Sequence, residues 1–436
     1  MAVSGGPMAQ ASASEVVPTG FLLRAPRSVE ETGLNLGFLI DLALKVLYFE
    51  GFLSGYELAE RMKLPYAGVV DQVLEFLKRE KLCEVKGAGG FAEAAYQYAI
   101  SDKGRLMARE ALDRSHYAGP APVPLAVYSD AIRQQSLGQI VVHQRTMRQA
   151  LSHLVISEEV FAQLGPAVNS GKSIFLFGPP GNGKTVIAEA IGKMIMSGTI
   201  YIPYAVEVDG QVIKVFDSVN HVRAEALAGG RNVDPRWVPI RRPMIMVGGE
   251  LTLETLDLVY DETNKYYEAP FQMKANGGML LIDDFGRQQV RPRDLLNRWI
   301  VPLEKRVDFL TLHTGRKIEV PFDVLIVFAT NLAPKDLVDE AFLRRIRHKI
   351  EIKNPTFDEY REIFRRVCQA KGVPYDDRGL AYLLQEHYIK PKRPLRACHP
   401  RDLVEQLCDI ARYLNVPPTL SPELIDRAAS AYFVEL

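Results

Sequence analysis

Residues 178–185 of this 436-residue chain, GPPGNGKT, combine glycines, a lysine and a threonine at a spacing that suits phosphate binding. The segment satisfies the pattern G-x-x-x-x-G-K-[ST], follows a short apolar run, SIFLF, and leads without a break into a helical pattern. Glycines let backbone N–H groups turn toward phosphate oxygens, and the N-terminus of the following helix adds the positive end of its dipole. Lys184 can reach the β- and γ-phosphates, while the Thr185 hydroxyl can ligate Mg²⁺. We therefore predict a nucleotide cradle that consists of Gly178, Pro179, Pro180, Gly181, Asn182, Gly183, Lys184 and Thr185.

A second segment, GGMLLIDDFG, places two adjacent carboxylates after an apolar strand. Met279 to Ile282 are predicted to lie inside a sheet with Asp283 at the carboxyl end, which is where open α/β sheets bind ligands. Asp283 is the predicted Mg²⁺ ligand, together with Thr185, and Asp284 is the predicted base that orients the attacking water. Because Asp is one methylene shorter than Glu, its carboxylate reaches less far toward that water, which slows a step that depends on geometry.

The composition is that of a globular protein, with 47% hydrophobic and 24% charged residues. Lys+Arg and Asp+Glu both number 53, so no overall field draws the chain to nucleic acid or to a membrane. The length predicts two or three domains. The four cysteines fit no CxxC pattern and are expected to be thiols. Neither a signal peptide nor a membrane span is recognisable, so we expect a cytoplasmic location without membrane insertion.

Five regions are predicted along the chain. They are a disordered leader (1–33), a helical region with short strands (34–117), a stiff Pro/Ala-rich linker (118–139), alternating strands and helices (140–352) and a helical end (353–436). In the second region a helix-turn-helix with an N-cap at Ser54 precedes a two-stranded wing, and a final helix with an N-cap at Ser101 follows. This order resembles the winged-helix module. Its acidic and basic residues nearly balance, and the predicted recognition helix begins PYAGVVDQVLEF, without Lys or Arg. Contact with protein is therefore favoured over contact with DNA.

From about residue 140 to the end, four motifs in order resemble those of the AAA+ ATPases. GPPGNGKT is similar to Walker A, MLLIDD to Walker B, DVLIVFATN to the sensor strand, and HPRDLVEQLCDIARYL to the lid helix of that family. The resemblance implies an α/β fold with a mainly parallel five-stranded sheet and a C-terminal helical lid, preceded by the N-terminal winged-helix domain. It also implies ATP and Mg²⁺ as cofactors. Replication initiators and helicase loaders of the same superfamily also have two aspartates in Walker B, so slow or stimulated hydrolysis is expected rather than none.

The resemblance also implies roles for four polar residues. Asn331 would hydrogen-bond the attacking water or the γ-phosphate, and its alternative role is to cap the next helix. Arg344 and Arg345, within VDEAFLRRIRHKIEI, would be fingers that reach a neighbouring subunit, or else solvated charges on a helix face. Arg401 would contact the nucleotide from the lid; the alternative is a local ion pair with Asp402 or Glu405.

Two segments exceed what the nucleotide-binding core requires. Residues 200–238 contain a β-hairpin signal at Asp209-Gly210, and this hairpin could touch a partner or cover a sheet edge. Residues 306–321 predict another hairpin just before the sensor strand, which resembles the presensor hairpin of the MoxR, RuvB and NtrC-like branch. A basic cluster precedes it, formed by Arg287, Arg291, Arg293 and Arg298; a solvated surface is its simplest interpretation.

The favoured function is that of an ATP-hydrolysing machine or switch that remodels a protein client as a homo-oligomeric ring, with six subunits expected. A DNA-associated regulator or loader, which would use the winged helix and the basic presensor region, is the first alternative. A scaffold that binds ATP only to assemble is the second.

Overall fold

Four short apolar segments and one polar edge strand build the sheet that carries the cradle. The computed structural model describes residues 23–88, 93–225, 233–333 and 344–433. The five strands are β5 (Ser173–Phe177), β10 (Met244–Val247), β13 (Met279–Ile282), β16 (Leu325–Thr330) and β17 (His348–Glu351). They lie in the order β10-β13-β16-β5-β17, and every neighbouring pair is parallel. The predicted α/β class with a five-stranded parallel sheet is confirmed.

Helices cover both faces of this sheet, which explains why the central strands β13 and β16 are continuous buried apolar runs. Ile174, Leu176 and Leu281 pack against the helices α6 (Gln144–Ala150), α7 (Glu158–Asn169) and α8 (Lys184–Ile195). The alternate positions Phe175 and Leu280 point to the other face, where α10 (Pro292–Arg298) and α11 (Ile300–Lys305) lie. The sheet therefore holds the ends of β5 and β13 in fixed positions.

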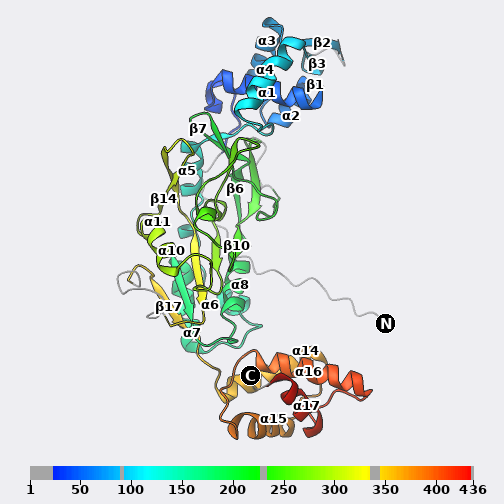
Figure 1. The fold of residues 1–436 in the computed structure, drawn as a ribbon, viewed down its shortest axis with the longest axis vertical. Coiled ribbons are helices and arrows are strands. Elements are labelled where there is room, and N and C mark those ends of the chain that lie inside the picture. Colours follow the sequence, from blue (N-terminus) through cyan, green and yellow to red (C-terminus); the bar gives the residue numbers. More distant parts are fainter. Residues whose placement is uncertain (1–22, 89–92, 226–232, 334–343, 434–436) are drawn as a thin grey trace.

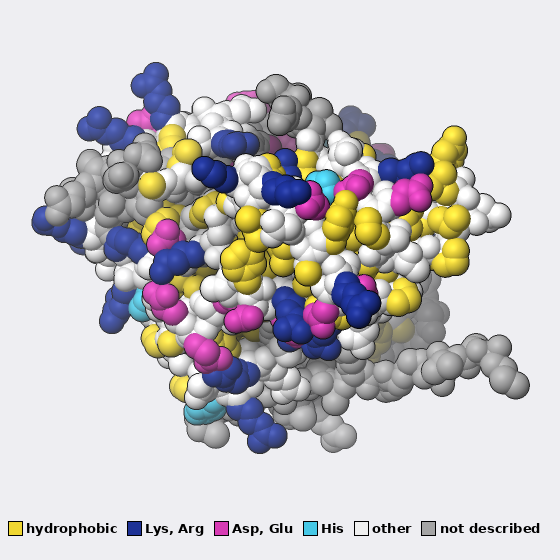
Figure 2. Space-filling model, turned by 90° about the horizontal axis from the view of Figure 1, so that it is seen from below, with side chains coloured by type: hydrophobic (Ala, Val, Ile, Leu, Met, Phe, Trp, Pro, Cys, Tyr) yellow, Lys and Arg dark blue, Asp and Glu magenta, His cyan; other side chains and the backbone are white. Residues whose placement is uncertain are grey.

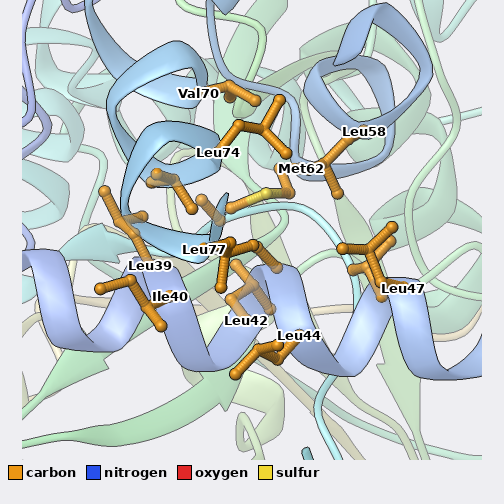
Figure 3. Packing of buried hydrophobic residues seen from close by; sticks show 14 of the residues in the cluster. Leu39, Ile40, Leu42, Leu44, Leu47, Leu58, Met62, Val70, Leu74 and Leu77 are labelled. Atoms are coloured by element: carbon orange, nitrogen blue, oxygen red, sulfur yellow. The ribbon is translucent and has the colours of Figure 1, made fainter. Parts of the chain in front are cut away.

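The N-terminal module consists of helices and a small antiparallel sheet. Its elements are α1 (Leu36–Glu50), β1 (Phe52–Ser54), α2 (Gly55–Met62), α3 (Asp71–Arg79), β2 (Cys83–Ala88), β3 (Tyr96–Ile100) and α4 (Asp102–Arg114), with strand order β1-β3-β2. Ser54 forms a capping box with Glu57, and Ser101 caps α4. Figure 3 shows the core, in which Leu39, Leu42 and Leu47 of α1 face side chains from α2 and α3.

The predicted linker is a folded segment. Residues 118–139 contain the strand β4 (Val123–Pro124) and the helix α5 (Leu125–Gln134). Tyr128 of α5 is fully buried, donates a hydrogen bond to the Met273 carbonyl and accepts one from Asn276. The Pro/Ala-rich composition suggested a spacer, but the apolar residues of α5 recur at helical spacing and pack into a core. The leader prediction is also too long: Val29 and Thr32 are buried, whereas residues 1–22 lie outside the described residues.

A β-rich region lies between the N-terminal module and the nucleotide-binding sheet (Figure 1). One sheet has the order β11-β12-β8-β7-β4, with β7 (Ala205–Val208), β8 (Gln211–Lys214), β11 (Val259–Asp261) and β12 (Tyr266–Glu268). Two further pairs are β6 (Thr199–Pro203) with β9 (Trp237–Arg241), and β14 (Val307–Thr311) with β15 (Lys317–Pro321); the helix α9 (Phe271–Lys274) precedes β13. Both expected hairpins are present, as β7–β8 and β14–β15, and Asp209 at the first tip pairs with Arg316 at the second.

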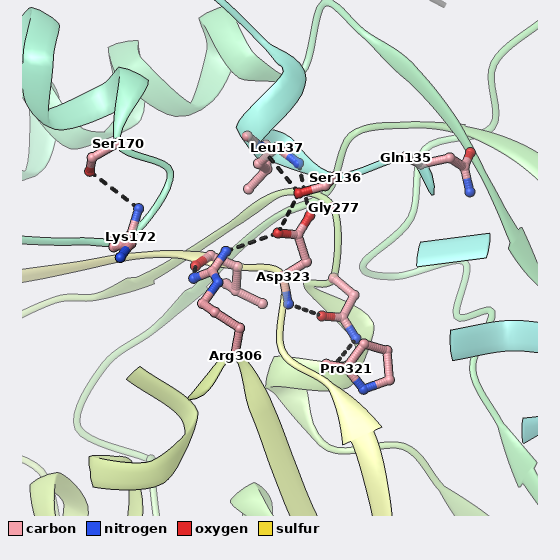
Figure 4. Close-up of polar contacts among 12 residues, drawn as sticks. Gln135, Ser136, Leu137, Ser170, Lys172, Gly277, Arg306, Pro321 and Asp323 are labelled. Atoms are coloured by element: carbon pink, nitrogen blue, oxygen red, sulfur yellow. Dashed lines mark hydrogen bonds and ion pairs between the residues drawn. The ribbon is translucent and has the colours of Figure 1, made fainter. Parts of the chain in front are cut away.

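Buried polar contacts fix the β-rich region to its neighbours. Asp323 accepts hydrogen bonds from the Ser136 hydroxyl (2.9 Å) and the Leu137 N–H (2.8 Å), and it pairs with Arg306 at 2.9 Å (Figure 4). At the other end, the buried Arg236 pairs with Asp234 (2.7 Å) and donates to the carbonyls of Thr32 and Pro122. These contacts hold α5 against the nucleotide-binding core and the N-terminal module against the β-rich region.

The C-terminal region is helical, as expected. It contains α14 (Phe357–Lys371), α15 (Asp377–Leu384), α16 (His399–Leu414) and α17 (Pro422–Tyr432) around a core that includes Tyr360, Phe364 and Leu407. Among the described residues, no helix is long and apolar enough to cross a membrane.

Candidate nucleotide-binding site

The predicted cradle is the loop between β5, which ends at Phe177, and α8, which begins at Lys184. Position 178 requires glycine, because a Cβ there would lie 2.3 Å from the Ile352 carbonyl oxygen. The φ of Gly178 is 135°, which side-chain-bearing residues rarely adopt. Gly183 caps α8 with a φ of 80°, a left-handed conformation that glycine adopts without steric cost. The glycines thus let the loop fold back toward the N-terminus of α8.

Lys184 is buried within this loop. Its Nζ donates hydrogen bonds to the carbonyls of Gly178 (3.0 Å) and Pro179 (2.9 Å). Burial lowers the pKa of Lys184; Asp284 and Asp283 raise it, and Arg396 lowers it further. A buried ammonium group held only by carbonyl dipoles is an electrostatically suitable partner for an anion.

The two predicted Mg²⁺ ligands meet at the carboxyl end of β13. The Thr185 hydroxyl lies 2.9 and 3.1 Å from the two carboxylate oxygens of Asp283, although the residues are 98 positions apart in the sequence. The Asp283 N–H donates to the Val247 carbonyl at 2.9 Å, so β10 fixes its backbone. A hydroxyl and a carboxylate are hard oxygen ligands of the kind that Mg²⁺ prefers, and the donor set therefore fits that ion.

Asp284 follows in a left-handed conformation, with a φ of 47°. Its side chain is exposed, and its Oδ1 accepts a hydrogen bond of 3.3 Å from the Asn331 amide at the end of β16. The structure thus brings the predicted base and the predicted sensor together. Asp and Asn tolerate this conformation better than most residues because their short polar side chains can bond locally, which gives a backbone reason for Asp in place of Glu.

Sequence reasoning missed Gln288, whose amide contacts the backbone of the same turn. Its Oε1 accepts from the Gly286 N–H at 2.8 Å, and its Nε2 donates to the carbonyls of Asp283 (2.8 Å) and Asp284 (3.2 Å). Only its position six residues after the end of β13 could have drawn attention to it. No residue-type pattern marks such a contact in advance.

The predicted fingers lie just after a segment outside the described residues, 334–343. The Arg345 Nε donates to Glu304 Oε1 of α11 at 2.6 Å, and the side chain is partly buried. Arg344 is exposed. The structure therefore keeps Arg345 in an ion pair of its own chain, and only Arg344 lies wholly at the surface.

Comparisons with known proteins agree with this geometry. Spastin from Anopheles gambiae is 26% identical over 249 residues, which are 57% of this chain and 24% of that protein. A proteasome-associated ATPase from Stackebrandtia nassauensis is 24% identical over 260 residues, 57% of this chain and 36% of that protein. The chain thus spans about a quarter to a third of these relatives. Both similarities accompany the cradle, the acidic strand and the parallel sheet described above.

The region from residue 140 onward resembles the P-loop module of the AAA+ ATPases, and the term AAA+ module denotes this region. Among solved structures, a RuvB mutant from Thermotoga maritima matches with 12% identity and a TM-score of 0.37 over 69% of this chain and 74% of that one. NtrX from Brucella abortus in complex with ATP matches with 15% identity and a TM-score of 0.37 over 80% and 66% of the two chains. A family profile described as a domain of unknown function (DUF8689) matches residues 356–431, the lid of the AAA+ module.

The lid of the AAA+ module touches the cradle through the residues just before α16. The Ala397 N–H donates to the Asn182 side chain (3.1 Å), and the Cys398 N–H donates to the Gly181 carbonyl (2.8 Å). Asn182 also donates to Asn354 at 2.8 Å, so one side chain connects the loop, the sheet end and the lid.

Arg396, not Arg401, is the lid arginine that faces the cradle. Its Cδ lies 3.7 Å from the position that a Cβ on Gly181 would occupy, and its half-buried guanidinium has no hydrogen bond or ion pair with any described residue. Arg401 instead pairs with Asp402 at 3.0 Å, and 63% of its side chain is exposed. In this structure Arg401 therefore adopts the local ion pair that was the alternative to its sensor role.

A cavity of about 180 Å³ lies beside the cradle, between the sheet and the lid. Its apolar lining includes Val155, Ile156 and Ile363, and Asn182 connects it to the phosphate-binding loop. The residues 351–356 form its floor at the end of β17.

Proposed function

We propose that the chain binds Mg²⁺-ATP at the cradle and hydrolyses it. The contact between Thr185 and Asp283, placed beside Lys184 at the carboxyl edge of the sheet, is the observation that carries this proposal. Thr185 and Asp283 would hold Mg²⁺, which neutralises negative charge on the phosphate oxygens. The cavity beside Asn182 would receive the adenine base, because apolar side chains line part of it, polar groups line the rest, and it adjoins the cradle.

In the proposed reaction, Asp284 orients a water molecule and accepts its proton, and the Asn331 amide holds the carboxylate or the water in place. Arg396 would bind phosphate oxygens from the lid, taking the part that the family resemblance gives to Arg401. A half-buried cation without a protein partner costs free energy, and phosphate would compensate it. The lid would then move when the phosphates change.

We further propose a homo-oligomeric ring in which Arg344 and Arg345 approach the nucleotide of the neighbouring subunit. A trans-acting guanidinium stabilises the charge that develops on the transferring phosphoryl group. Arg345 would exchange its ion pair with Glu304 (2.6 Å) for this contact, and the exposed Arg344 would approach beside it. Assembly would thus be linked to turnover.

A protein client is favoured over nucleic acid. The N-terminal module would act as a winged-helix docking domain, and its helix α3 begins with Asp71 and carries Glu75, which oppose phosphate contact. Figure 2 shows acidic and basic side chains interleaved on the face of the lid end. The ion pairs of the lid include Arg361–Asp377 (3.0 Å) and Lys371–Glu405 (2.6 Å). That face offers no broad field of one sign. The contacts of Arg236 would transmit motion of the ring to the N-terminal module.

One observation favours a DNA-associated regulator as the second candidate. Arg287, Arg291 and Arg293 are exposed and make no ion pair with the part of the chain that the structure describes. Arg298 leaves this predicted cluster, since it pairs with the buried Asp308 (3.0 Å). Charge reversal at Arg291 and Arg293 would abolish salt-dependent duplex binding if DNA were the client.

Phosphate release and assembly measured together test the proposal. The full-length protein should release phosphate from ATP, Lys184→Ala should not bind the nucleotide, and Asp284→Asn should bind and assemble without turnover. Phosphate release at the background rate in the wild type, with ATP-dependent assembly intact, would support the non-hydrolysing scaffold instead. Absence of both binding and assembly would refute the nucleotide site itself.

A further inference from the structure

Gln288 binds three backbone groups of the turn that carries the two aspartates. Its amide oxygen accepts from Gly286 (2.8 Å), and its amide nitrogen donates to the carbonyls of Asp283 (2.8 Å) and Asp284 (3.2 Å). Only one orientation of the amide satisfies these contacts, because the reverse would place an oxygen against two carbonyl oxygens and an NH₂ group against an N–H. A glutamine at this position therefore matches the turn group by group.

The turn has one rotatable part between two fixed points. Asp283 is fixed to β10 by its hydrogen bond to Val247 (2.9 Å), and Phe285 is fixed to β16 by its hydrogen bond to Ala329 (2.7 Å). Between them Asp284 has a φ of 47°, which costs a non-glycine residue on the order of 1 kcal/mol. The direction of the Asp284 carboxylate depends on this conformation, and the two carbonyls held by Gln288 are the groups that rotate with it.

We propose that Gln288 is a positioning residue for ATP hydrolysis, acting through Asp284 and not by contact with the nucleotide. This inference rests on the proposed ATPase activity. By holding the carbonyls of Asp283 and Asp284, Gln288 keeps the Asp284 carboxylate beside the Asn331 amide. Within the described part of the chain, the side-chain hydrogen bonds of Gln288 go to Gly286, Asp283 and Asp284 and not to the cradle or Thr185, so we expect nucleotide affinity not to depend on it.

The neighbouring Gln289 provides a matched control. Gln289 is exposed and forms no side-chain hydrogen bond with any described residue. The variant Gln289→Met therefore makes the same substitution at the adjacent position without removing such a bond. Gln288→Met keeps the length of the side chain but removes both kinds of hydrogen bond. Gln288→Glu keeps the acceptor for Gly286 and, when ionised, sets a negative charge against two carbonyl oxygens.

Steady-state hydrolysis and the affinity for a fluorescent ATP analogue are measured for the full-length variants. Gln288→Met is expected to lower kcat by about tenfold to a hundredfold, since hydrolysis is sensitive to displacements of about an ångström, with KM and analogue affinity within about twofold. Gln289→Met should match the wild type. Gln288→Glu should be as slow as Gln288→Met at pH 8, because its ionised carboxylate has no donor for the two carbonyls.

Amide hydrogen exchange gives a readout that does not require turnover. The Gly286 N–H should exchange faster in Gln288→Met than in the wild type, because its acceptor is lost. An unchanged kcat, or equal losses of kcat and nucleotide affinity, would overturn the positioning role. If the wild type binds ATP without hydrolysing it, the proposed ATPase function fails. In that case, an equal exchange rate of the Gly286 N–H in the wild type and in Gln288→Met would still show that Gln288 does not hold the turn.

Discussion

Replacing Arg396 by alanine removes the guanidinium of the lid that faces the phosphate cradle. A hydrogen bond to a charged group contributes about 1.5–3 kcal/mol, which corresponds to an affinity change of about tenfold to a hundredfold. Arg396 is only partly buried, so water competes for its guanidinium group and reduces the net contribution of such a bond. We therefore expect the lower end of this range, an affinity for ATP about tenfold weaker.

Arg401→Ala is the control for this prediction. Arg401 pairs with Asp402 at 3.0 Å and 63% of its side chain is exposed, and exposed ion pairs contribute about 0–1 kcal/mol. Its loss should change ATP affinity by less than about threefold. Arg396→Lys, which keeps the charge without the planar fork, should fall between the two alanine variants.

Titration of a fluorescent ATP analogue, competed by ATP and by ADP, measures these affinities, and a thermal unfolding curve of each variant checks the fold. A larger loss for ATP than for ADP would show that Arg396 contacts the γ-phosphate. The reasoning is refuted if Arg401→Ala weakens ATP binding about tenfold while Arg396→Ala leaves it unchanged.

Three further outcomes follow from the structure. Asp284→Asn should keep ATP affinity and slow phosphate release by about 10²–10⁴-fold, which a phosphate-release assay measures. Asp284→Glu should destabilise the fold by about 1 kcal/mol without faster turnover, because residue 284 has a φ of 47°; urea unfolding and phosphate release measure the two effects. Arg236→Met should lower the free energy of unfolding by about 3–5 kcal/mol in urea, since it leaves the buried Asp234 carboxylate without its partner. Burial lowers the pKa of Lys45 to about 8, so the folded state loses this proton at a lower pH than the unfolded state does. The free energy of unfolding in urea should therefore rise as pH increases from about 8 toward the ordinary lysine pKa of about 10.4. The Lys45→Met variant should lack that rise.

The sequence by itself determined the predicted phosphate cradle and the position of the acidic residues at the end of a buried strand. The spacing of Gly178, Gly183 and Lys184 is a local property, because a glycine-lined turn between a strand and a helix needs only consecutive residues. Met279 to Ile282 form an apolar run that can only be buried, so Asp283 had to stand at the carboxyl edge of the sheet. Length and composition also predicted several domains, without showing how they are joined.

Only the tertiary structure decided which distant groups reach the cradle. Arg396 and Gly181 are far apart in the sequence, and the packing of the lid, not a motif, places Arg396 there and leaves Arg401 in an ion pair with Asp402. The role of residues 118–139 likewise depends on Tyr128, which is buried only because the β-rich region supplies its surroundings. Local patterns encode turns and strands through backbone conformation and period, whereas contacts between elements depend on shapes that form only when the whole chain packs.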